Sequence, residues 1–179
     1  MYSFRQINLR TLAATIAIYM PTWIQAQQTT LYDPQPPANS AYVRVIVGGV
    51  TPPVDVWVNK KPKLTLLTAG TPSDYMVLPA GQHDLSIQSG KHQIPVKLEV
   101  KASRSLTVLV PSFGQGRDAI VIEDKVNSNR LKAIITVYQL GSTEPLDLWT
   151  ADGGTQIFKA LPMGGTAALV VNPINLEFQ

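Results

Sequence analysis

The sequence predicts an all-β protein, with two tandem antiparallel β-sandwich domains of the immunoglobulin-like or jelly-roll-like kind after a signal peptide, the second domain incomplete. Three observations lead to this prediction. Short aliphatic runs alternate with polar residues at a period of two after residue 27, and 14 Pro and 12 Gly supply turns between them. One stretch of the chain also repeats, and no stretch shows the period of an amphipathic helix.

The first 26 residues have the features of a secretory signal peptide. Arg5 and Arg10 make the start positive, Leu12–Met20 is a short apolar run, and Ala26 is a small residue at the expected cleavage point. The apolar run is shorter than the roughly 20 residues of a membrane-spanning helix; an uncleaved anchor is the alternative. We expect export to the periplasm, with a Pro-rich extended lead-in over residues 27–39.

Composition narrows the classes of partner. The whole chain has a formal net charge of +3, and loss of residues 1–26 removes two arginines and no acidic residue, which leaves about +1. A nearly neutral surface lacks the basic patch of a nucleic-acid-binding protein. The sequence has no Cys, so neither disulfides nor thiolate metal sites can stabilise the fold, and burial of apolar side chains must do so.

The first predicted domain covers residues 40–123. Val43, Val45 and Val47 alternate with more polar neighbours, and residues 94–100 and 106–110 alternate in the same way. Each run therefore has one face suited to a core and one suited to water or a second layer. Several such strands at close spacing, with turn residues between them, indicate a sandwich or a barrel.

An internal repeat supplies the other boundaries. Residues 43–57 (VRVIVGGVTPPVDVW) align with residues 135–149 (ITVYQLGSTEPLDLW), and Leu-Pro-Ala-Gly at 78–81 returns as Leu-Pro-Met-Gly at 161–164. The shared pattern Pro-hydrophobe-Asp-hydrophobe-Trp favours a duplication over chance. The repeat predicts a linker over residues 124–130 and a second domain over residues 131–179.

The second copy is shorter than the first. About 30 residues with two long alternating strands follow the first Leu-Pro-x-Gly turn, whereas residues 165–179 alone follow the second. We therefore expect a truncated second domain with one or two sheet edges or a core face uncovered. Either the chain is shortened or a partner completes the domain.

Several segments carry a resemblance to a known family. They are residues 31–34 (LYDP), 40–45 (SAYVRV), 78–81 (LPAG), 94–98 (IPVKL) and 146–153 (LDLWTADG), followed by Asn172-Pro173. In this collinear order the chain resembles the AlgF family of periplasmic alginate O-acetylation proteins, whose members continue past the point where this sequence ends. The resemblance implies two β-sandwich domains and a non-catalytic adaptor or relay role in exopolysaccharide O-acetylation. The implied partners are a membrane-bound O-acyltransferase and periplasmic SGNH-type acetyltransferases.

The residues give no support for catalysis. An acetyl-transfer enzyme needs a nucleophile, a base and oxyanion donors, but the sequence has neither a Gly-x-Ser-x-Gly elbow nor the blocks of an SGNH enzyme. His83 and His92 are expected to be exposed turn residues, and two histidines without a third ligand make a poor metal site. Asp118, Glu123 and Asp124 fall at a loop and linker, where solvated charge is expected. We expect no enzyme activity, no cofactor and no metal.

A candidate interaction surface remains. Asp55 and Trp57 share the strand face opposite three valines, and Asp147 and Trp149 repeat this arrangement. A Trp beside a carboxylate can stack on a sugar ring or anchor a protein contact; packing over a sheet edge or under a loop is the alternative. Tyr32, in the lead-in, either packs along the first domain or contacts a partner.

Two functions are consistent with this surface. The first is an adaptor of a polysaccharide O-acetylation complex, and the alternative is a carbohydrate-binding module that acts directly on an exopolysaccharide. An esterase or acetyltransferase is disfavoured. The residues do not distinguish alginate from other exopolysaccharides as the acetylated polymer.

Overall fold

All regular structure in the described part of the chain is β-strand, which confirms the predicted fold class. The computed structural model describes residues 36–49, 53–111, 113, 118–126, 129 and 131–172. The predicted signal peptide, most of the lead-in and Tyr32 lie outside these residues. No helix in the described ranges is long and apolar enough to cross a membrane.

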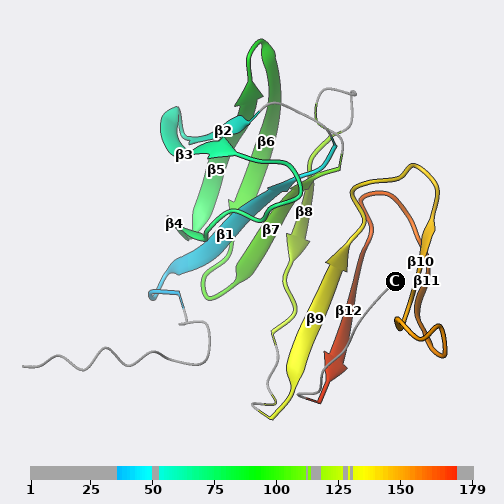
Figure 1. The fold of residues 1–179 in the computed structure, drawn as a ribbon. Helices are drawn as coiled ribbons and strands as arrows, with labels where there is room; N and C mark the ends of the chain where they lie inside the picture. The colour runs from blue at the N-terminus through cyan, green and yellow to red at the C-terminus, as the bar shows by residue number, and fades with distance from the viewer. Residues whose placement is uncertain are drawn as a thin grey trace, which may run out of the picture. The chain divides into compact units, whose positions relative to one another are not determined.

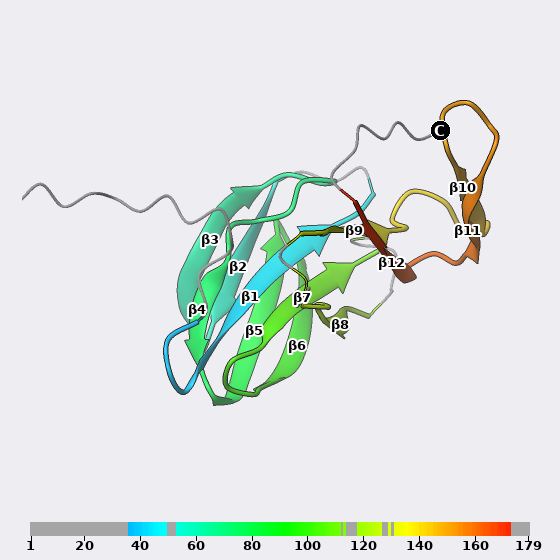
Figure 2. The ribbon, with the colours of Figure 1, turned by 90° about the horizontal axis from the view of Figure 1, so that it is seen from below.

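Eight strands between residues 40 and 123 form two four-stranded sheets that face each other (Figures 1 and 2). Sheet A has the order β4-β1-β7-β8 and sheet B the order β3-β2-β5-β6. Their bounds are β1 (Ser40–Val47), β2 (Val54–Val58), β3 (Lys61–Leu67), β4 (Met76–Pro79), β5 (Gly81–Ser89), β6 (His92–Val100), β7 (Ser105–Val110) and β8 (Ile120–Glu123).

The core lies between the two sheets and follows the alternation in the sequence. Strands β1, β2, β5 and β6 bury every second residue over much of their length, because successive side chains of a strand point to opposite faces. The buried set is almost entirely aliphatic and includes Val43, Val45, Val54, Val56, Leu85, Ile87, Leu98 and Val108.

The predicted antiparallel pairing holds for every strand pair of the two sheets except one. Strands β1 and β7 pair in parallel, from Tyr42 with Ser105 to Val47 with Val110. Parallel pairing needs a long crossover rather than a hairpin, and here the chain forms the four strands of sheet B and β4 of sheet A between the two strands. Sheet A is therefore mixed.

Four further strands follow: β9 (Ala133–Tyr138), β10 (Leu146–Trp149), β11 (Gln156–Leu161) and β12 (Thr166–Val171). They form two antiparallel pairs, β9 with β12 and β10 with β11, and most of their side chains are half-buried or exposed. By the sequence repeat, β9 and β10 correspond to β1 and β2. The correspondence ends before the Leu-Pro-x-Gly segments, because Leu78 lies on β4, which pairs with β1, whereas Leu161 lies on β11, which pairs with β10.

The face of sheet A that points away from the core is itself partly covered. Thr107 and Leu109 of β7 are 0% exposed and Ile46 of β1 is 2% exposed, although none of the three belongs to the core cluster. At the end of β1, a Cβ on Gly48 would lie 2.4 Å from the carbonyl oxygen of Pro111 and 2.8 Å from Cβ of Leu140. Of the two surroundings expected for an outer face, water or a second layer, sheet A has a second layer at this end.

Candidate functional site

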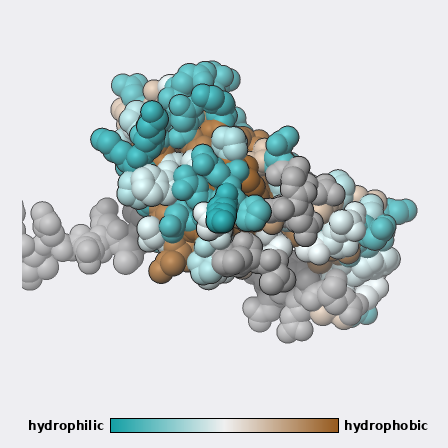
Figure 3. Space-filling view, turned by 90° about the horizontal axis from the view of Figure 1, so that it is seen from above, coloured by the Kyte–Doolittle hydropathy of each residue, from teal (hydrophilic) through white to brown (hydrophobic). Residues whose placement is uncertain are grey.

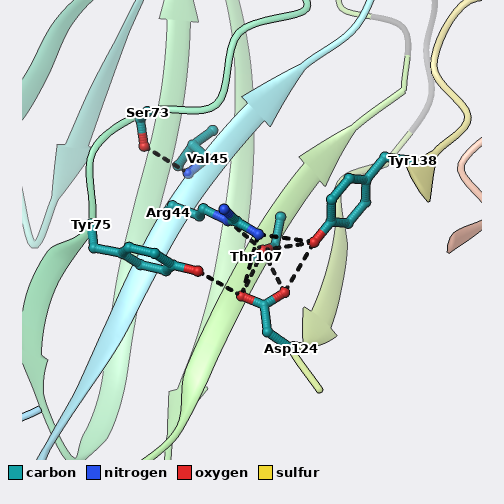
Figure 4. Close-up of polar contacts among 7 residues, drawn as sticks. All are labelled: Arg44, Val45, Ser73, Tyr75, Thr107, Asp124 and Tyr138. Atoms are coloured by element: carbon teal, nitrogen blue, oxygen red, sulfur yellow. Dashed lines mark hydrogen bonds and ion pairs between the residues drawn. The ribbon is translucent and has the colours of Figure 1, made fainter. Parts of the chain in front are cut away.

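A polar cluster lies on the outer face of sheet A (Figure 4). Arg44 of β1 points away from the core, as the alternation of its strand predicts. Its Nε donates to Oγ1 of Thr107 on β7 at 3.0 Å, and its Nη2 donates to the hydroxyl of Tyr138 on β9 at 3.1 Å. The guanidinium also lies over the rings of Tyr75, at 4.9 Å, and Tyr138, at 5.9 Å, within the range of cation–π attraction.

Asp124 is the common acceptor of three hydroxyl groups in this cluster. It receives hydrogen bonds from Oγ1 of Thr107 at 2.7 Å, from the hydroxyl of Tyr138 at 3.1 Å and from the hydroxyl of Tyr75 at 3.1 Å. Nη2 of Arg44 lies 3.8 Å from its Oδ2. The side chain of Asp124 is 13% exposed, so the interpretation of this residue as a solvated linker charge is wrong.

The tertiary structure alone brings these groups together. Tyr75 precedes β4, Asp124 directly follows β8, and Tyr138 ends β9, so no local spacing in the sequence connects them. A carboxylate with so little access to water requires hydrogen-bond donors, and each donor here comes from a different segment. No motif could have indicated this cluster.

The surroundings in the cluster stabilise the charged form of Arg44 and the neutral form of Tyr75. Burial disfavours the charged guanidinium, but Tyr75, Asp124 and Tyr138 outweigh it and raise the pKa of Arg44. Burial, together with the charge of Asp124, raises the pKa of Tyr75 above its usual range. Arg44 is therefore a fixed cation and Tyr75 a fixed hydroxyl donor at neutral pH. Thr107, the only aliphatic hydroxyl in the cluster, is fully buried and out of reach of a substrate.

His83 is bound at both ring nitrogens. It lies half-buried within β5, not in an exposed turn as expected, and Nε2 is 2.9 Å from the carbonyl oxygen of Pro79 while Nδ1 is 3.0 Å from Nδ2 of Asn59. A carbonyl can only accept, so Nε2 carries a proton, and Nδ1 accepts from the amide. The two contacts join β5 to Pro79 of β4 and to Asn59 in the turn between β2 and β3. His92 is exposed at the start of β6.

Asp55 and Trp57 share the outer face of sheet B, as predicted, because Val54, Val56 and Val58 are buried. Oδ1 of Asp55 accepts a hydrogen bond from the backbone N–H of Leu66 at 3.0 Å. Leu66 has a φ of 56° at a register shift between β2 and β3. The carboxylate therefore stabilises a β-bulge.

The second Asp-x-Trp segment has the same local structure. Asp147 accepts a hydrogen bond at Oδ1 from the backbone N–H of Ala160 at 2.6 Å and one at Oδ2 from Nε2 of Gln156 at 2.9 Å. Ala160 has a φ of 51° at a register shift between β10 and β11. Both predicted aspartates thus have structural contacts. Trp57 is half-buried, and Trp149 is 37% exposed.

No metal site emerges in the described part of the chain. No group of three or more His, Asp or Glu side chains there is placed to hold a metal ion. In the Arg44–Asp124 cluster the donors and acceptors bind one another.

Fold and cluster together define a class: a β-sandwich protein with a second, smaller set of paired strands joined to it by a partly buried polar cluster. The family model described as "Alginate O-acetyl transferase AlgF" matches residues 15–179. The chain belongs to the AlgF family.

Known relatives are similar along most of this chain. The alginate biosynthesis protein AlgF of Pseudomonas putida is 29% identical over 167 residues, and that of Pseudomonas aeruginosa is 32% identical over 153 residues. These matches cover 93% and 86% of this chain but 73% and 66% of the two relatives. The AlgF of Pseudomonas fluorescens is 30% identical, with 65% of its length covered. The family description names a transferase, whereas the relatives are named biosynthesis proteins.

Proposed function

We propose that this protein is a non-catalytic, periplasmic adaptor in the O-acetylation of an alginate-type exopolysaccharide. Its partners in this proposal are a membrane-bound O-acyltransferase and periplasmic SGNH-type acetyltransferases. Membership of the AlgF family carries the assignment to alginate acetylation. The burial and the hydrogen bonds of the polar side chains support an adaptor role rather than a catalytic one.

A transferase needs a nucleophile with a base beside it and access for the substrate. The aliphatic hydroxyl that donates to Asp124 is that of Thr107, which is fully buried. The half-buried His83 has both ring nitrogens in hydrogen bonds. Ser73 accepts from the backbone N–H of Val45 and donates to the carbonyl of Asp74. These groups support folding rather than acyl transfer.

Exposed apolar side chains on the second set of strands support a protein-binding role. Leu146 and Trp149 of β10 are 46% and 37% exposed, and Val170 of β12 is 47% exposed. In the corresponding strand β2, Val54 is 0% exposed because sheet A covers it. Exposed apolar and aromatic side chains are typical of protein interfaces. We therefore place the acetyltransferase contact on β10.

The first experiment is a clean deletion of the gene followed by quantification of polymer yield and of acetyl groups per sugar by proton NMR. We expect unacetylated polymer at nearly normal yield, restored to normal acetylation by the wild-type gene. A fully acetylated polymer in the deletion strain would refute the proposal.

The second experiment tests the contact surface by pull-down of the acetyltransferases with purified mature protein. Leu146→Asp should reduce capture at least tenfold, because it places a charge in an apolar contact. Val77→Asp is the matched control, since Val77 is also 46% exposed but lies on β4 of sheet A; it should capture as well as wild type. Equal loss in both variants, or in neither, would contradict the assignment to β10.

The third experiment measures hydrolysis of a chromogenic acetyl ester by the purified protein. We expect the rate of buffer alone. If ester hydrolysis well above the buffer rate co-purified with the protein, the protein would be an enzyme and the non-catalytic adaptor proposal would be refuted.

A further inference from the structure

We propose that the β2–β3 hairpin docks this protein on an anionic phospholipid surface, with three lysines at the lipid phosphates and Leu66 as the apolar contact. The hairpin belongs to sheet B, whereas the protein contact proposed above lies on β10. The proposal goes beyond the adaptor role and does not depend on it.

Positive charge is concentrated along this hairpin. Residues 59–73 contain three lysines and no acidic residue. The three are Lys60, Lys61 and Lys63, and all are exposed. None of the ion pairs among the described residues involves them. The hairpin therefore presents a basic patch to the solvent.

The two carboxylates next to this patch have other partners. Asp55 of β2 accepts a hydrogen bond from the backbone N–H of Leu66 at 3.0 Å. Asp84 of β5 lies 2.6 Å from Nζ of Lys97, and this contact lowers the pKa of Asp84 more than the charge of Lys60 does. The lysines of the hairpin are therefore available to anions from outside the chain.

The tip of the hairpin presents a lysine on a strained backbone. Asn59 and Lys60 form a two-residue turn with φ values of 49° and 65°, and Val58 pairs with Lys61 across it. A turn with two positive φ values favours Gly at its second position, because a side chain is strained there. Lysines on an edge strand discourage pairing with other sheets, but Lys60 lies in the turn and provides no such protection. A contact with an anion gives this lysine a role.

Leu66 combines two unfavourable features. Its side chain is 73% exposed, and its backbone has a φ of 56°. Apolar groups also show between the hydrophilic ones on the face drawn in Figure 3, so exposure alone identifies no ligand. A residue other than Gly with a positive φ is rarer, and such residues concentrate at ligand-binding sites. Leu66 therefore provides an observation independent of the lysines.

The second half of the chain shows that the bulge does not require a leucine. Ala160 occupies the equivalent position in β11, with a φ of 51° and a hydrogen bond from its N–H to Asp147. It is exposed as well, so a single methyl group is enough at this position. The larger side chain of Leu66 is therefore available for a contact outside the chain.

The combination of lysines and an exposed leucine favours a lipid surface over a protein. The centres of protein interfaces are depleted in lysine. Near an anionic membrane, each lysine strengthens binding roughly fivefold, so three together give about a hundredfold. A leucine adds to this attraction by entering the boundary between headgroups and acyl chains. The half-buried Trp57 lies opposite Pro62 of β3, and Trp is suited to the same boundary.

The test is flotation of the purified mature protein with vesicles, either with about 30% phosphatidylglycerol or of phosphatidylcholine alone, in roughly 20 mM and 200 mM salt. We expect partition onto the phosphatidylglycerol vesicles that weakens at high salt, and little onto phosphatidylcholine. The combined variant Lys60→Gln, Lys61→Gln and Lys63→Gln should lower this partition at least tenfold. Leu66→Ala should lower it severalfold, because it removes the apolar contact.

Each change has a control of the same size. The combined variant Lys91→Gln, Lys101→Gln and Lys125→Gln removes the same charge from exposed positions in other segments. Leu131→Ala shortens a leucine that is 81% exposed and lies between β8 and β9. Both controls should bind within about twofold of wild type in the higher salt, where distant charges are screened.

Circular dichroism and urea unfolding check that each variant is folded. Absence of binding to phosphatidylglycerol vesicles by the wild type, equal binding to both kinds of vesicle, or equal loss in the two lysine variants would each overturn the inference. Hairpin variants that lost capture of the acetyltransferases but kept vesicle binding would make the hairpin a protein contact instead. Since acetyltransferases are absent from the vesicle assay, its failure leaves the adaptor proposal untouched.

Discussion

Asp55 and Asp147 occupy equivalent positions in the two halves of the chain, and each accepts a hydrogen bond from a backbone N–H whose residue has a positive φ. The two aspartates therefore hold the same β-bulge in the hairpins β2–β3 and β10–β11. This shared contact gives the Asp of the repeated pattern a structural role in both halves. The Asp is needed where the extra residue of the bulge leaves a backbone donor without a strand partner.

Replacing Asp55 with Ala should lower the free energy of unfolding by about 1–3 kcal/mol, because the N–H of Leu66 loses a charged acceptor. Asp55→Asn keeps an acceptor oxygen and should cost less. Urea unfolding followed by Trp fluorescence measures both. If Asp55→Ala were as stable as wild type, the carboxylate would not stabilise the bulge.

Leu66→Gly should be neutral or stabilising, by up to about 0.5 kcal/mol. Leu66 is 73% exposed and has a φ of 56°, so Gly relieves about 1–2 kcal/mol of left-handed strain and loses part of that gain to the entropy of the unfolded chain. Its neighbour Thr65 is exposed and has no positive φ. Thr65→Gly, the control, should destabilise by about 0.5–1 kcal/mol. Equal changes in the free energy of unfolding for Leu66→Gly and Thr65→Gly would contradict backbone strain at Leu66.

The Arg44–Asp124 cluster should behave as one unit. Arg44→Met leaves the carboxylate of Asp124 with little solvent and without its cation, which should cost about 2–3 kcal/mol. Tyr138→Phe removes a donor to Asp124 and an acceptor for Arg44, so a double-mutant cycle of the two changes should give a coupling energy near 1 kcal/mol or more. Simple additivity in urea unfolding would show that the contacts contribute independently.

Stability should fall at alkaline pH because of Tyr75. The folded state raises the pKa of this hydroxyl, chiefly by burial and then by the charge of Asp124. The contribution is fully present below the usual pKa of Tyr, near 10, and is lost as the pH rises through the folded value. Tyr75→Phe should therefore flatten the decline in the urea midpoint between about pH 9.5 and 11. If the urea midpoint of Tyr75→Phe declined as steeply as that of wild type, groups other than Tyr75 would cause the alkaline loss of stability.

Gly48→Ala should cost about 1–3 kcal/mol. The added Cβ would lie 2.4 Å from the carbonyl oxygen of Pro111, and a backbone atom cannot move aside without disturbing β7. Gly141→Ala is the matched control, because no atom lies within 4 Å of its Cβ position; it should stay within about 0.5 kcal/mol of wild type. Thermal unfolding of the two variants distinguishes the outcomes.

Much of the first sandwich could be read from periodicity. A strand places successive side chains on opposite faces, so the alternation around Val43, Val45 and Val47 was enough to predict which residues form the core. The same rule placed Asp55 and Trp57 on the outer face of sheet B. Periodicity could not show that β1 and β7 pair in parallel, because pairing partners depend on the path of the whole chain.

The sequence by itself determined the all-β class, the family and the internal repeat, since these depend on the order and the spacing of residue types along the chain. The tertiary structure decided that Asp124 lies mostly shielded from water beside Arg44, Tyr75 and Tyr138, and that the two aspartates of the repeat stabilise bulges. It also placed Pro62 and Ser86 opposite Trp57 on the two neighbouring strands. These relations join residues from separate strands, and only the closing of the sheets brings their atoms within range of one another.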